Sequence, residues 1–418
     1  MDAQAAAEGD SPGAIGPVSV APADPGRTAA VLPPFVPPFL PGDFLPPFVA
    51  AAPHNPQFHL HAVAGMRLLV LFLGDAGPDL RAEIHAVLRR LGDLLMQRQI
   101  RLLAICRPGT EVADAAIRPA DCTWIWDPDD GIATSYGVPR DDLETGGIRP
   151  TAFLLRENLQ LLARLDAGAP AGLARALDPL LRQVPAPEPY RRQDHHAPIL
   201  LVPGALPPAL CRDLIAYYER RGGTPSGFMR DLGGRTVGLH DPGMKRRTDC
   251  PIEDPQLLAV IRRMLLRRVV PEIRKAFCFR ATRVERYIVA RYDGGEGGFF
   301  RAHRDNTSRG TAHRRFAMTV NLNSDGFDGG ELCFPEYGRS LYRPPTGAAL
   351  VFSCSMLHEA RPVTAGQRYA FLPFFYDDEA ADIRQQNLQF VGAGGQPADT
   401  AAADGAIPEE EGGCAGAG

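Results

Sequence analysis

The chain has 418 residues, of which 45% are hydrophobic and 22% charged, and these proportions are those of an ordinary globular protein with two or three domains. Its net charge of -4 argues against a general nucleic-acid binder, and its longest apolar run, at 68–74, is too short to cross a bilayer. Eight cysteines without any C-x-x-C pair indicate neither a disulfide framework nor a structural zinc site. We therefore expect a cytoplasmic protein that binds neither nucleic acid nor membrane.

Both ends of the chain are predicted to be disordered. Residues 1–40 are rich in Ala, Gly and Pro and carry too little apolar surface to offset the entropy lost on ordering. Residues 391–418 form an acidic segment of low complexity.

Residues 41–182 alternate between strand and helix patterns. The runs "RLLVLFLG" and "IRLLAICR" are typical of buried strands, and the segment between them has apolar residues at helical spacing. "TAFLLRENLQLLARLD" predicts a hairpin, and "GLARALDPLLRQ" predicts a helix after it. This order predicts an α/β domain with a central sheet and helices on its faces.

Residues 183–197 are rich in proline and charge and are expected to form a linker before a second domain at 198–382. The pair His195-His196 could bind a metal, although a solvated linker is the better interpretation. Two helices are predicted next, "ALPPALCRDLIAYYERRGG" and "DPQLLAVIRRMLLRRVVPEIRKAF", the second capped by Asp254 with Pro255 at its first position.

The second predicted helix is basic, but its arginines are better explained as a solvated face than as a nucleic-acid contact. Between the two helices lies "MKRRTD" at 244–249. This segment either lines the substrate entrance or forms an ordinary surface turn.

From 283 to 376 the pattern changes to short strands separated by turns rich in Gly and Pro, which predicts an antiparallel barrel or jelly roll. The expected strands lie in "RVERYIVARY", "RRFAMTVNLN", "GELCFPEY", "GAALVFSC", "HEARPV" and "RYAFLPFFY".

Within this region His303 and Asp305 stand two residues apart, a spacing that places both side chains on one face of a strand. Two more histidines, His313 and His358, lie in the same region. An isolated H-x-D is most simply a hydrogen-bonded surface pair. Two histidines and a carboxylate on one metal would instead leave three positions open, as in non-haem Fe(II) oxygenases, whereas structural zinc prefers four protein ligands.

Arg368 favours the iron interpretation. The turn "TAGQ" is expected to fold the segment after His358 into a hairpin, which places Arg368 on the neighbouring strand with its side chain inside the barrel. A buried guanidinium needs an anionic partner, and the distal carboxylate of 2-oxoglutarate would provide a bidentate one.

The segment "YIVARYDGGEGGFFRAHRDN", together with "FDGGEL", "PPTGAALVF" and "HEARPVTAGQRYAF", resembles the prolyl 4-hydroxylase type of Fe(II)/2-oxoglutarate dioxygenase. The resemblance implies a double-stranded β-helix (jelly roll) with flanking helices. It implies that His303, Asp305 and His358 bind Fe(II), with no catalytic residue beyond this metal centre. It further implies that Arg368 binds the C5 carboxylate of 2-oxoglutarate.

By the same resemblance Tyr292 contacts the co-substrate, and Asn321 stands where relatives often have a tyrosine, so its role departs from the family pattern. The implied reaction uses O2, converts 2-oxoglutarate to succinate and CO2, and hydroxylates a substrate C–H. Ascorbate (vitamin C) is the expected reductant. A protein prolyl residue is the leading substrate, with other peptides and small molecules as alternatives.

Residues 41–182 resemble the peroxiredoxin branch of the thioredoxin fold, on the segments "PGDFLPPF", "DPDDGIATSYGV" and "GIRPTAFLL". The helix start "GDAGPDLRAEI" lacks the peroxidatic cysteine, and Cys106 and Cys122 are in the wrong places to replace it. The resemblance therefore implies an inactive, thioredoxin-like docking module. Two alternatives stay open: a metal-binding barrel that senses without turnover, and a thiol peroxidase.

Overall fold

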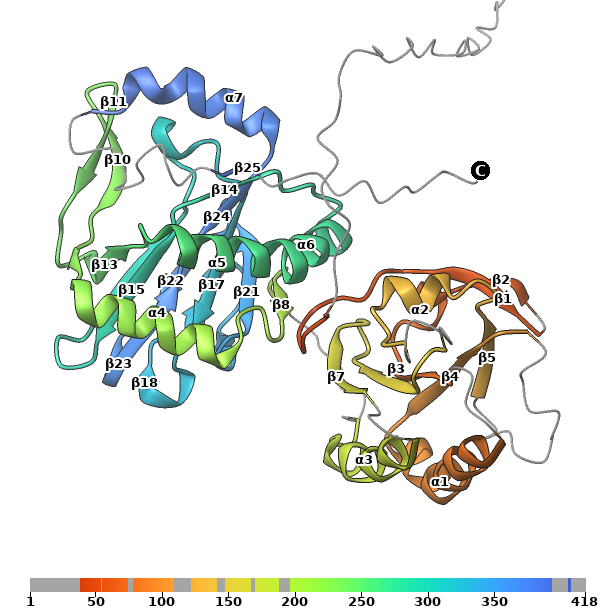
Figure 1. The fold of residues 1–418 in the computed structure, drawn as a ribbon. Helices are drawn as coiled ribbons and strands as arrows, with labels where there is room; N and C mark the ends of the chain where they lie inside the picture. Colours follow the sequence, from red (N-terminus) through yellow and green to blue (C-terminus); the bar gives the residue numbers. More distant parts are fainter. Residues whose placement is uncertain are drawn as a thin grey trace, which may run out of the picture. The chain divides into compact units, whose positions relative to one another are not determined.

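The computed structural model describes two parts of the chain, each with its own sheet system (Figure 1). The described residues are 38–53, 55–73, 78–108, 122–140, 147–166, 170–187, 196–392 and 405–406. The predicted disordered ends, 1–40 and 391–418, lie almost wholly outside these residues. No helix in the described ranges is long and apolar enough to span a membrane.

The N-terminal part contains a seven-stranded mixed sheet in the order β2-β1-β5-β4-β3-β6-β7. The central strands β3, β4 and β5 are parallel, while β6 and β7 form the antiparallel hairpin predicted from the sequence. Its strands are β1 Val49–Ala52, β2 Asn55–His59, β3 Arg67–Phe72, β4 Ile100–Cys106, β5 Cys122–Trp126, β6 Thr151–Leu155 and β7 Leu161–Asp166. Its helices are α1 Pro78–Gln97, α2 Gly131–Ser135 and α3 Pro170–Gln183.

Both faces of this sheet are buried, as expected for a continuous apolar strand such as β3. Leu69 and Leu71 point into the core beneath α1 and α3, which pack side by side (Figure 1). The alternate residues Val70 and Phe72 point into the opposite core, which includes residues of α2. The α/β architecture predicted for this region is therefore present.

The C-terminal part is built on two antiparallel sheets and a separate hairpin. The smaller sheet has the order β12-β16-β22-β19-β20. Its strands are β12 Lys245–Arg246, β16 Phe299–His303, β22 His358–Ala360, β19 Leu332–Cys333 and β20 Leu341–Tyr342. A core that includes Phe300, Leu332, Tyr292 and Phe352 draws residues from both sheets and so lies between them.

The larger sheet follows the path β25-β14-β24-β17-β23-β15-β13-β9, with β18, β21 and β8 paired off this path. Its strands are β8 Leu200–Val202, β9 Thr224–Pro225, β13 Thr248–Pro251, β14 Arg283–Glu285, β15 Ile288–Asp293, β17 Phe316–Asn321, β18 Phe327–Gly329, β21 Ala349–Ser353, β23 Val363–Phe371, β24 Phe374–Tyr376 and β25 Gly405–Ala406. The hairpin consists of β10 Phe228–Leu232 and β11 Arg235–Leu239.

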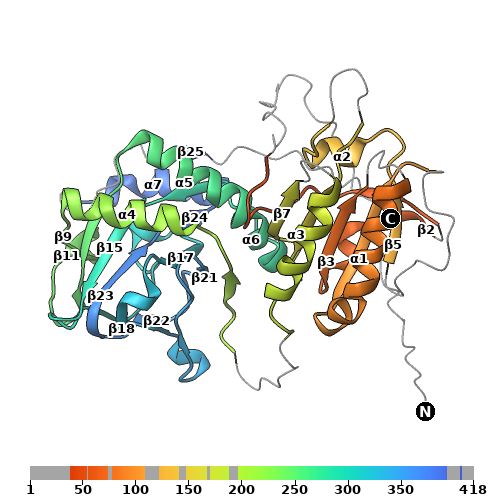
Figure 2. The same ribbon diagram turned by 60° about the horizontal axis from the view of Figure 1, so that its bottom comes forward.

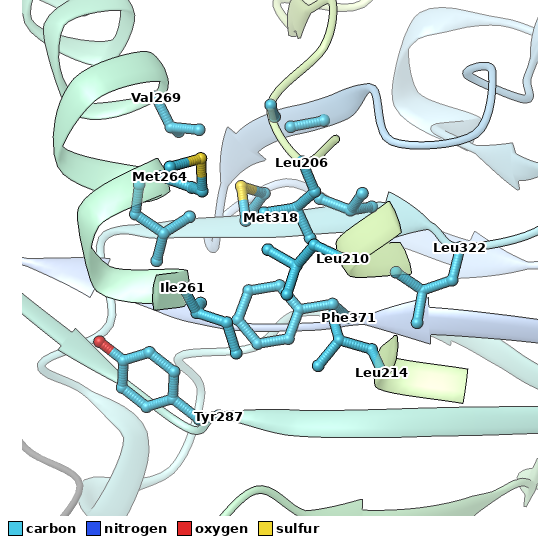
Figure 3. Packing of buried hydrophobic residues seen from close by; sticks show 14 of the residues in the cluster. Leu206, Leu210, Leu214, Ile261, Met264, Val269, Tyr287, Met318, Leu322 and Phe371 are labelled. Atoms are coloured by element: carbon cyan, nitrogen blue, oxygen red, sulfur yellow. The ribbon is translucent and has the colours of Figure 1, made fainter. Parts of the chain in front are cut away.

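Helices cover the outer face of the larger sheet (Figure 2). Leu210 and Leu214 of α4 pack with Ile261 of α5 against Met318 and Phe371 of the sheet (Figure 3). The helices of the C-terminal part are α4 Pro208–Arg221, α5 Pro255–Arg268, α6 Val270–Phe277 and α7 Asp378–Asn387, of which the first three contribute residues to this core.

The second predicted helix is in fact two helices, α5 and α6. Asp254 caps α5 as predicted, because its carboxylate accepts hydrogen bonds from the amides of Gln256 and Leu257. The chain starts a new helix at Val270, with Pro271 in its first turn. Proline cannot donate the backbone hydrogen bond that would continue α5, which explains the break.

The predicted strand "RVERYIVARY" is also divided, into β14 and β15. Arg286, between them, has a φ of 68°, a left-handed conformation that interrupts an extended strand. The β10–β11 hairpin was not predicted, because the apolar residues of "FMRDLGGRTVGL" do not alternate regularly over the whole segment. In the structure most of its strand residues are exposed or half-buried.

Candidate metal centre

Three potential metal ligands meet where β16 and β22 pair. His303, the last residue of β16, lies directly opposite His358, the first residue of β22. Asp305 lies between the imidazoles, with Oδ1 3.4 Å from Nε2 of His303 and Oδ2 3.3 Å from Nε2 of His358. The three donor atoms lie within 4.8 Å of one another, close enough for a single ion. Among the described residues this is the one such cluster of three or more His, Cys, Asp or Glu.

Backbone carbonyls fix the orientation of both imidazoles. Nδ1 of His303 lies 2.7 Å from the carbonyl oxygen of Arg301, and Nδ1 of His358 lies 3.0 Å from that of Met356. When Nδ1 carries the proton, it donates to the carbonyl and leaves the Nε2 lone pair free for a metal. Both Nε2 atoms face Asp305, so the tautomer with its proton on Nδ1 suits coordination of a metal through Nε2.

The surroundings of the histidines are apolar. The Phe300 ring stacks on His303 at 3.5 Å between centroids, and the Phe352 ring lies 4.6 Å from that of His358. Burial lowers the pKa of His303 to about 4, which keeps this imidazole neutral at pH 7. Burial also opposes charge on His358, but the Asp305 carboxylate raises its pKa above the ordinary value. A carboxylate beside two imidazoles in apolar surroundings suits a divalent cation.

The strand geometry assumed for H-x-D was wrong in one respect. The strand β16 ends at His303, so Asp305 lies in the following turn and not on the same strand face. Its position is set by the bond from its backbone N–H to the carbonyl of Cys354, at 3.0 Å. The two side chains converge nevertheless.

Arg304, between the two predicted ligands, points away from them as expected. Its guanidinium donates to both carboxylate oxygens of Glu336, at 2.6 and 3.1 Å, and to the carbonyl of Ser355. Glu336 also accepts from the backbone N–H of Leu357, at 2.8 Å, immediately before His358. One carboxylate thus connects the two chain segments that carry the ligands.

We expect Glu336→Gln to weaken binding of Co(II) about tenfold, the lower range for loss of an outer partner of a metal site. The amide keeps the shape of the side chain but loses the charge that holds Arg304. A Co(II) titration followed by absorbance measures the affinity. Glu359→Gln is the matched control, because Glu359 adjoins His358 but pairs with Arg361, at 3.3 Å. Equal losses of Co(II) affinity in both variants would contradict the role given to Glu336.

His313 does not join the metal cluster. Its Nε2 lies 2.8 Å from Oε2 of Glu285. The other carboxylate oxygen of Glu285, Oε1, accepts from Nε of Arg314 at 2.5 Å. All three side chains are buried. Burial by itself would raise the pKa of Glu285, but Arg314 and His313 hold it below its ordinary value. His313 therefore has a structural role within a buried ionic cluster.

Glu285→Gln is expected to lower the free energy of unfolding by about 3 kcal/mol at pH 7, because it leaves a buried arginine without its carboxylate. A depressed carboxyl pKa stabilises the fold above the pKa of the unfolded chain, about 4.3 for Glu. The difference between wild type and variant should therefore shrink as the pH falls below that value. Urea unfolding at pH 7 and at about pH 3 tests this, and a difference that grows toward low pH would contradict it.

Arg368 is buried, as predicted, but it reaches the interior by a different path. "TAGQ" is no turn, because β23 runs unbroken through it, and the chain changes direction earlier, at Arg361 and Pro362. β22 belongs to the smaller sheet and β23 to the larger one, so His358 and Arg368 come from different sheets. Tyr292 of β15 is the register partner of Arg368.

The Arg368 guanidinium is only partly satisfied. Nε donates to Oδ1 of Asn321 at 3.0 Å, and Nη2 donates to Oγ1 of Thr319 at 3.2 Å. Nη1 is buried without a hydrogen-bond partner, and Arg368 forms no salt bridge with a described carboxylate. Burial lowers the pKa of Arg368 below its ordinary value. A buried cation in this state fits an incoming carboxylate.

The other two predicted contacts also lie at Arg368. Its guanidinium carbon is 5.0 Å from the centre of the Tyr292 ring. Asn321 uses its oxygen for Arg368 and its amide nitrogen for the carbonyl of Pro344, at 3.2 Å. Thr319 was missed, although its position two residues before Asn321 on β17 placed it on the same strand face.

Residues 287–376 match the model of the 2OG-Fe(II) oxygenase superfamily. This segment is therefore similar to members of that superfamily. It contains His303, Asp305, His358 and Arg368, so the cluster found in the structure lies inside the 2OG-Fe(II) oxygenase segment.

A PKHD-type hydroxylase of Burkholderia lata is 36% identical over 108 residues, which are 24% of this chain and 46% of that protein. The chain thus spans about half the length of this curated relative. A prolyl hydroxylase structure from Trichoplax adhaerens covers 45% of this chain and 86% of its own, at 18% identity and a TM-score of 0.35. Peroxiredoxin Q of Xanthomonas campestris covers 32% of this chain and 90% of its own, at 19% identity and a TM-score of 0.28.

Outside the oxygenase segment, other candidate residues are not brought into a site. Of the predicted pair, His195 lies outside the described residues, and His196 packs against the Tyr342 ring at 5.9 Å. Cys106 ends β4 and Cys122 begins β5, and no disulfide joins any two of the described cysteines.

Proposed function

We propose that the protein is an Fe(II)- and 2-oxoglutarate-dependent dioxygenase that hydroxylates an unactivated C–H of its substrate and releases succinate and CO2. The proposal rests on the superfamily match and on the donor set of two histidines and one carboxylate, which leaves coordination positions for other ligands. When bound, Fe(II) with 2-oxoglutarate and O2 would supply the oxidising chemistry.

The observation that carries the proposal is the buried Nη1 of Arg368. It fits the distal carboxylate of a keto diacid whose other end lies at the metal cluster. His303, Asp305 and His358 would hold Fe(II), while Arg368 would orient the co-substrate. The rings of Phe300, Phe334 and Phe352 would keep water from the histidines.

The test is succinate release from 2-oxoglutarate by the full chain after anaerobic loading with Fe(II) and addition of air. Succinate is expected, and it should not form when Zn(II) replaces Fe(II). If even high enzyme concentrations with Fe(II) give no succinate while the metal binds, a sensing barrel without turnover is the better function.

The finer parts of the proposal concern substrate and organisation. The resemblance to prolyl 4-hydroxylases makes a protein prolyl residue the first substrate to test, by mass spectrometry for an added oxygen. Ascorbate is proposed as reductant, and the cytoplasm as location. We further propose a thioredoxin-like docking module at 41–182, a linker at 183–197 and a double-stranded β-helix domain at 198–382.

A further inference from the structure

The segment "MKRRTD" forms two short strands with its alternate side chains buried. Lys245 and Arg247 are buried, whereas Arg246 between them is exposed. β12 pairs with β16, the strand of His303, and β13 pairs with β15, the strand of Tyr292. The segment therefore connects the strand of a candidate metal ligand with that of a candidate co-substrate contact, and Arg247 stands between its two strands.

Arg247 is held in place by a carboxylate. Its Nε lies 2.7 Å from Oδ1 of Asp249, and its Nη2 donates to Oδ2 at 2.7 Å. The same Oδ2 accepts from Nη2 of Arg286 at 3.0 Å and from the hydroxyl of Ser226 at 2.5 Å. Burial alone would raise the pKa of Asp249, but the cations around it, first Arg247, hold it well below its ordinary value. The guanidinium thus has little freedom to rotate.

The remaining edge of Arg247 faces Tyr292. Nη1 donates to the phenol oxygen of Tyr292 at 3.2 Å. Because this oxygen accepts from Arg247, the phenol hydrogen must find its own acceptor, and none of the described residues provides one. The Tyr292 ring also lies against Arg368, whose Nη1 lacks a partner. The hydroxyl hydrogen of Tyr292 and Nη1 of Arg368 are thus two donors without acceptors among the described residues, and they belong to side chains that contact each other.

We propose that Arg247 is a positioning residue for the 2-oxo acid co-substrate. By donating to the Tyr292 oxygen, it turns the phenol hydrogen toward the carboxylate that pairs with Arg368. A charged donor on the phenol oxygen also polarises the O–H bond and strengthens the bond that it donates. The inference rests on the proposed function and adds to it a residue outside the matched segment 287–376.

A double-mutant cycle tests the inference by calorimetry, with 2-oxoglutarate titrated into full-length, Zn(II)-loaded protein without O2. Arg247→Met and Tyr292→Phe should each raise the Kd about tenfold, the effect of one charge-assisted hydrogen bond. The double variant should bind no more weakly than either single variant, because both changes remove the same bond. Arg246→Met, on the exposed neighbour, is the matched control and should bind like wild type.

Steady-state kinetics, which separates an effect on KM from an effect on kcat, provides a second readout. In Fe(II)-loaded protein, Arg247→Met should raise KM for 2-oxoglutarate while kcat for succinate release stays within about twofold, because binding and not chemistry is affected. Should Arg247→Met fail to fold, Arg247→Lys keeps the charge beside Asp249 but cannot bridge to Tyr292, and the same rise in Kd is expected.

Unchanged Kd in Arg247→Met, or losses that multiply to about 100-fold in the double variant, would overturn the inference, because independent contacts add in free energy. Failure of wild type to bind 2-oxoglutarate would instead overturn the proposed function. The two results are therefore distinguishable.

Discussion

Asp305→Ala is expected to lower succinate release by more than about 100-fold, because loss of a ligand costs more than loss of an outer partner, which costs about 10- to 100-fold. Asp305 is the one anionic donor of the three, and its two oxygens face both imidazoles, at 3.4 and 3.3 Å. Without it, a divalent cation would meet two neutral ligands in an apolar setting. Succinate measured by mass spectrometry at saturating 2-oxoglutarate, together with Fe(II) retained after anaerobic dialysis, checks the expectation.

His240→Ala is the control for this experiment, because His240 is an exposed histidine outside the cluster. It should retain both Fe(II) and activity. Succinate release by Asp305→Ala at a rate near that of wild type would show that the cluster is not the iron site.

Arg368→Met should raise the Kd for 2-oxoglutarate by about 100-fold or more, because a carboxylate that loses a buried charge partner loses about 3 kcal/mol. The fold should respond differently. Arg368 is a buried cation without a carboxylate, so its removal offsets the loss of its hydrogen bonds to Asn321 and Thr319. The ligand-free variant should therefore unfold within about 1 kcal/mol of wild type.

Calorimetry with Zn(II)-loaded protein and urea unfolding of the ligand-free chain measure the two effects separately. Arg343→Met is a suitable comparison, because Arg343 is an exposed arginine that donates to the backbone carbonyls of Ser324 and Phe327. Its loss should weaken the fold and leave the Kd nearly unchanged. If Arg368→Met were strongly destabilised but bound 2-oxoglutarate with normal affinity, Arg368 would have a structural role and not the proposed role in co-substrate binding.

The sequence predicted the helices and strands better than it predicted which strands pair with one another. Local patterns were sufficient for the β6–β7 hairpin and the Asp254 cap, because each depends on a few neighbouring residues. The path of Arg368 into the interior was not predictable in this way. Whether β23 pairs with β22 or crosses to the other sheet depends on strands distant in the sequence, such as β15 and β17.

The candidate site shows the same limit. The spacing of His303 and Asp305 predicted their proximity, although the turn after β16 and the bond to the Cys354 carbonyl bring it about. The burial of Arg247 could not be read from "MKRRTD", where charged residues stand in a row. Only pairing with β15 and β16 on either side places alternate side chains inside.

The crossing from β22 to β23 has a consequence for selectivity. His358 and Arg368 lie on opposite layers of a sandwich, and packed sheets are separated by about 10 Å. If the chain binds a keto diacid as proposed, the side chains that fill this interlayer space would limit the length of the carbon chain between its two carboxylates. A shorter acid would leave one end unmatched, and a longer one would have to push the layers apart.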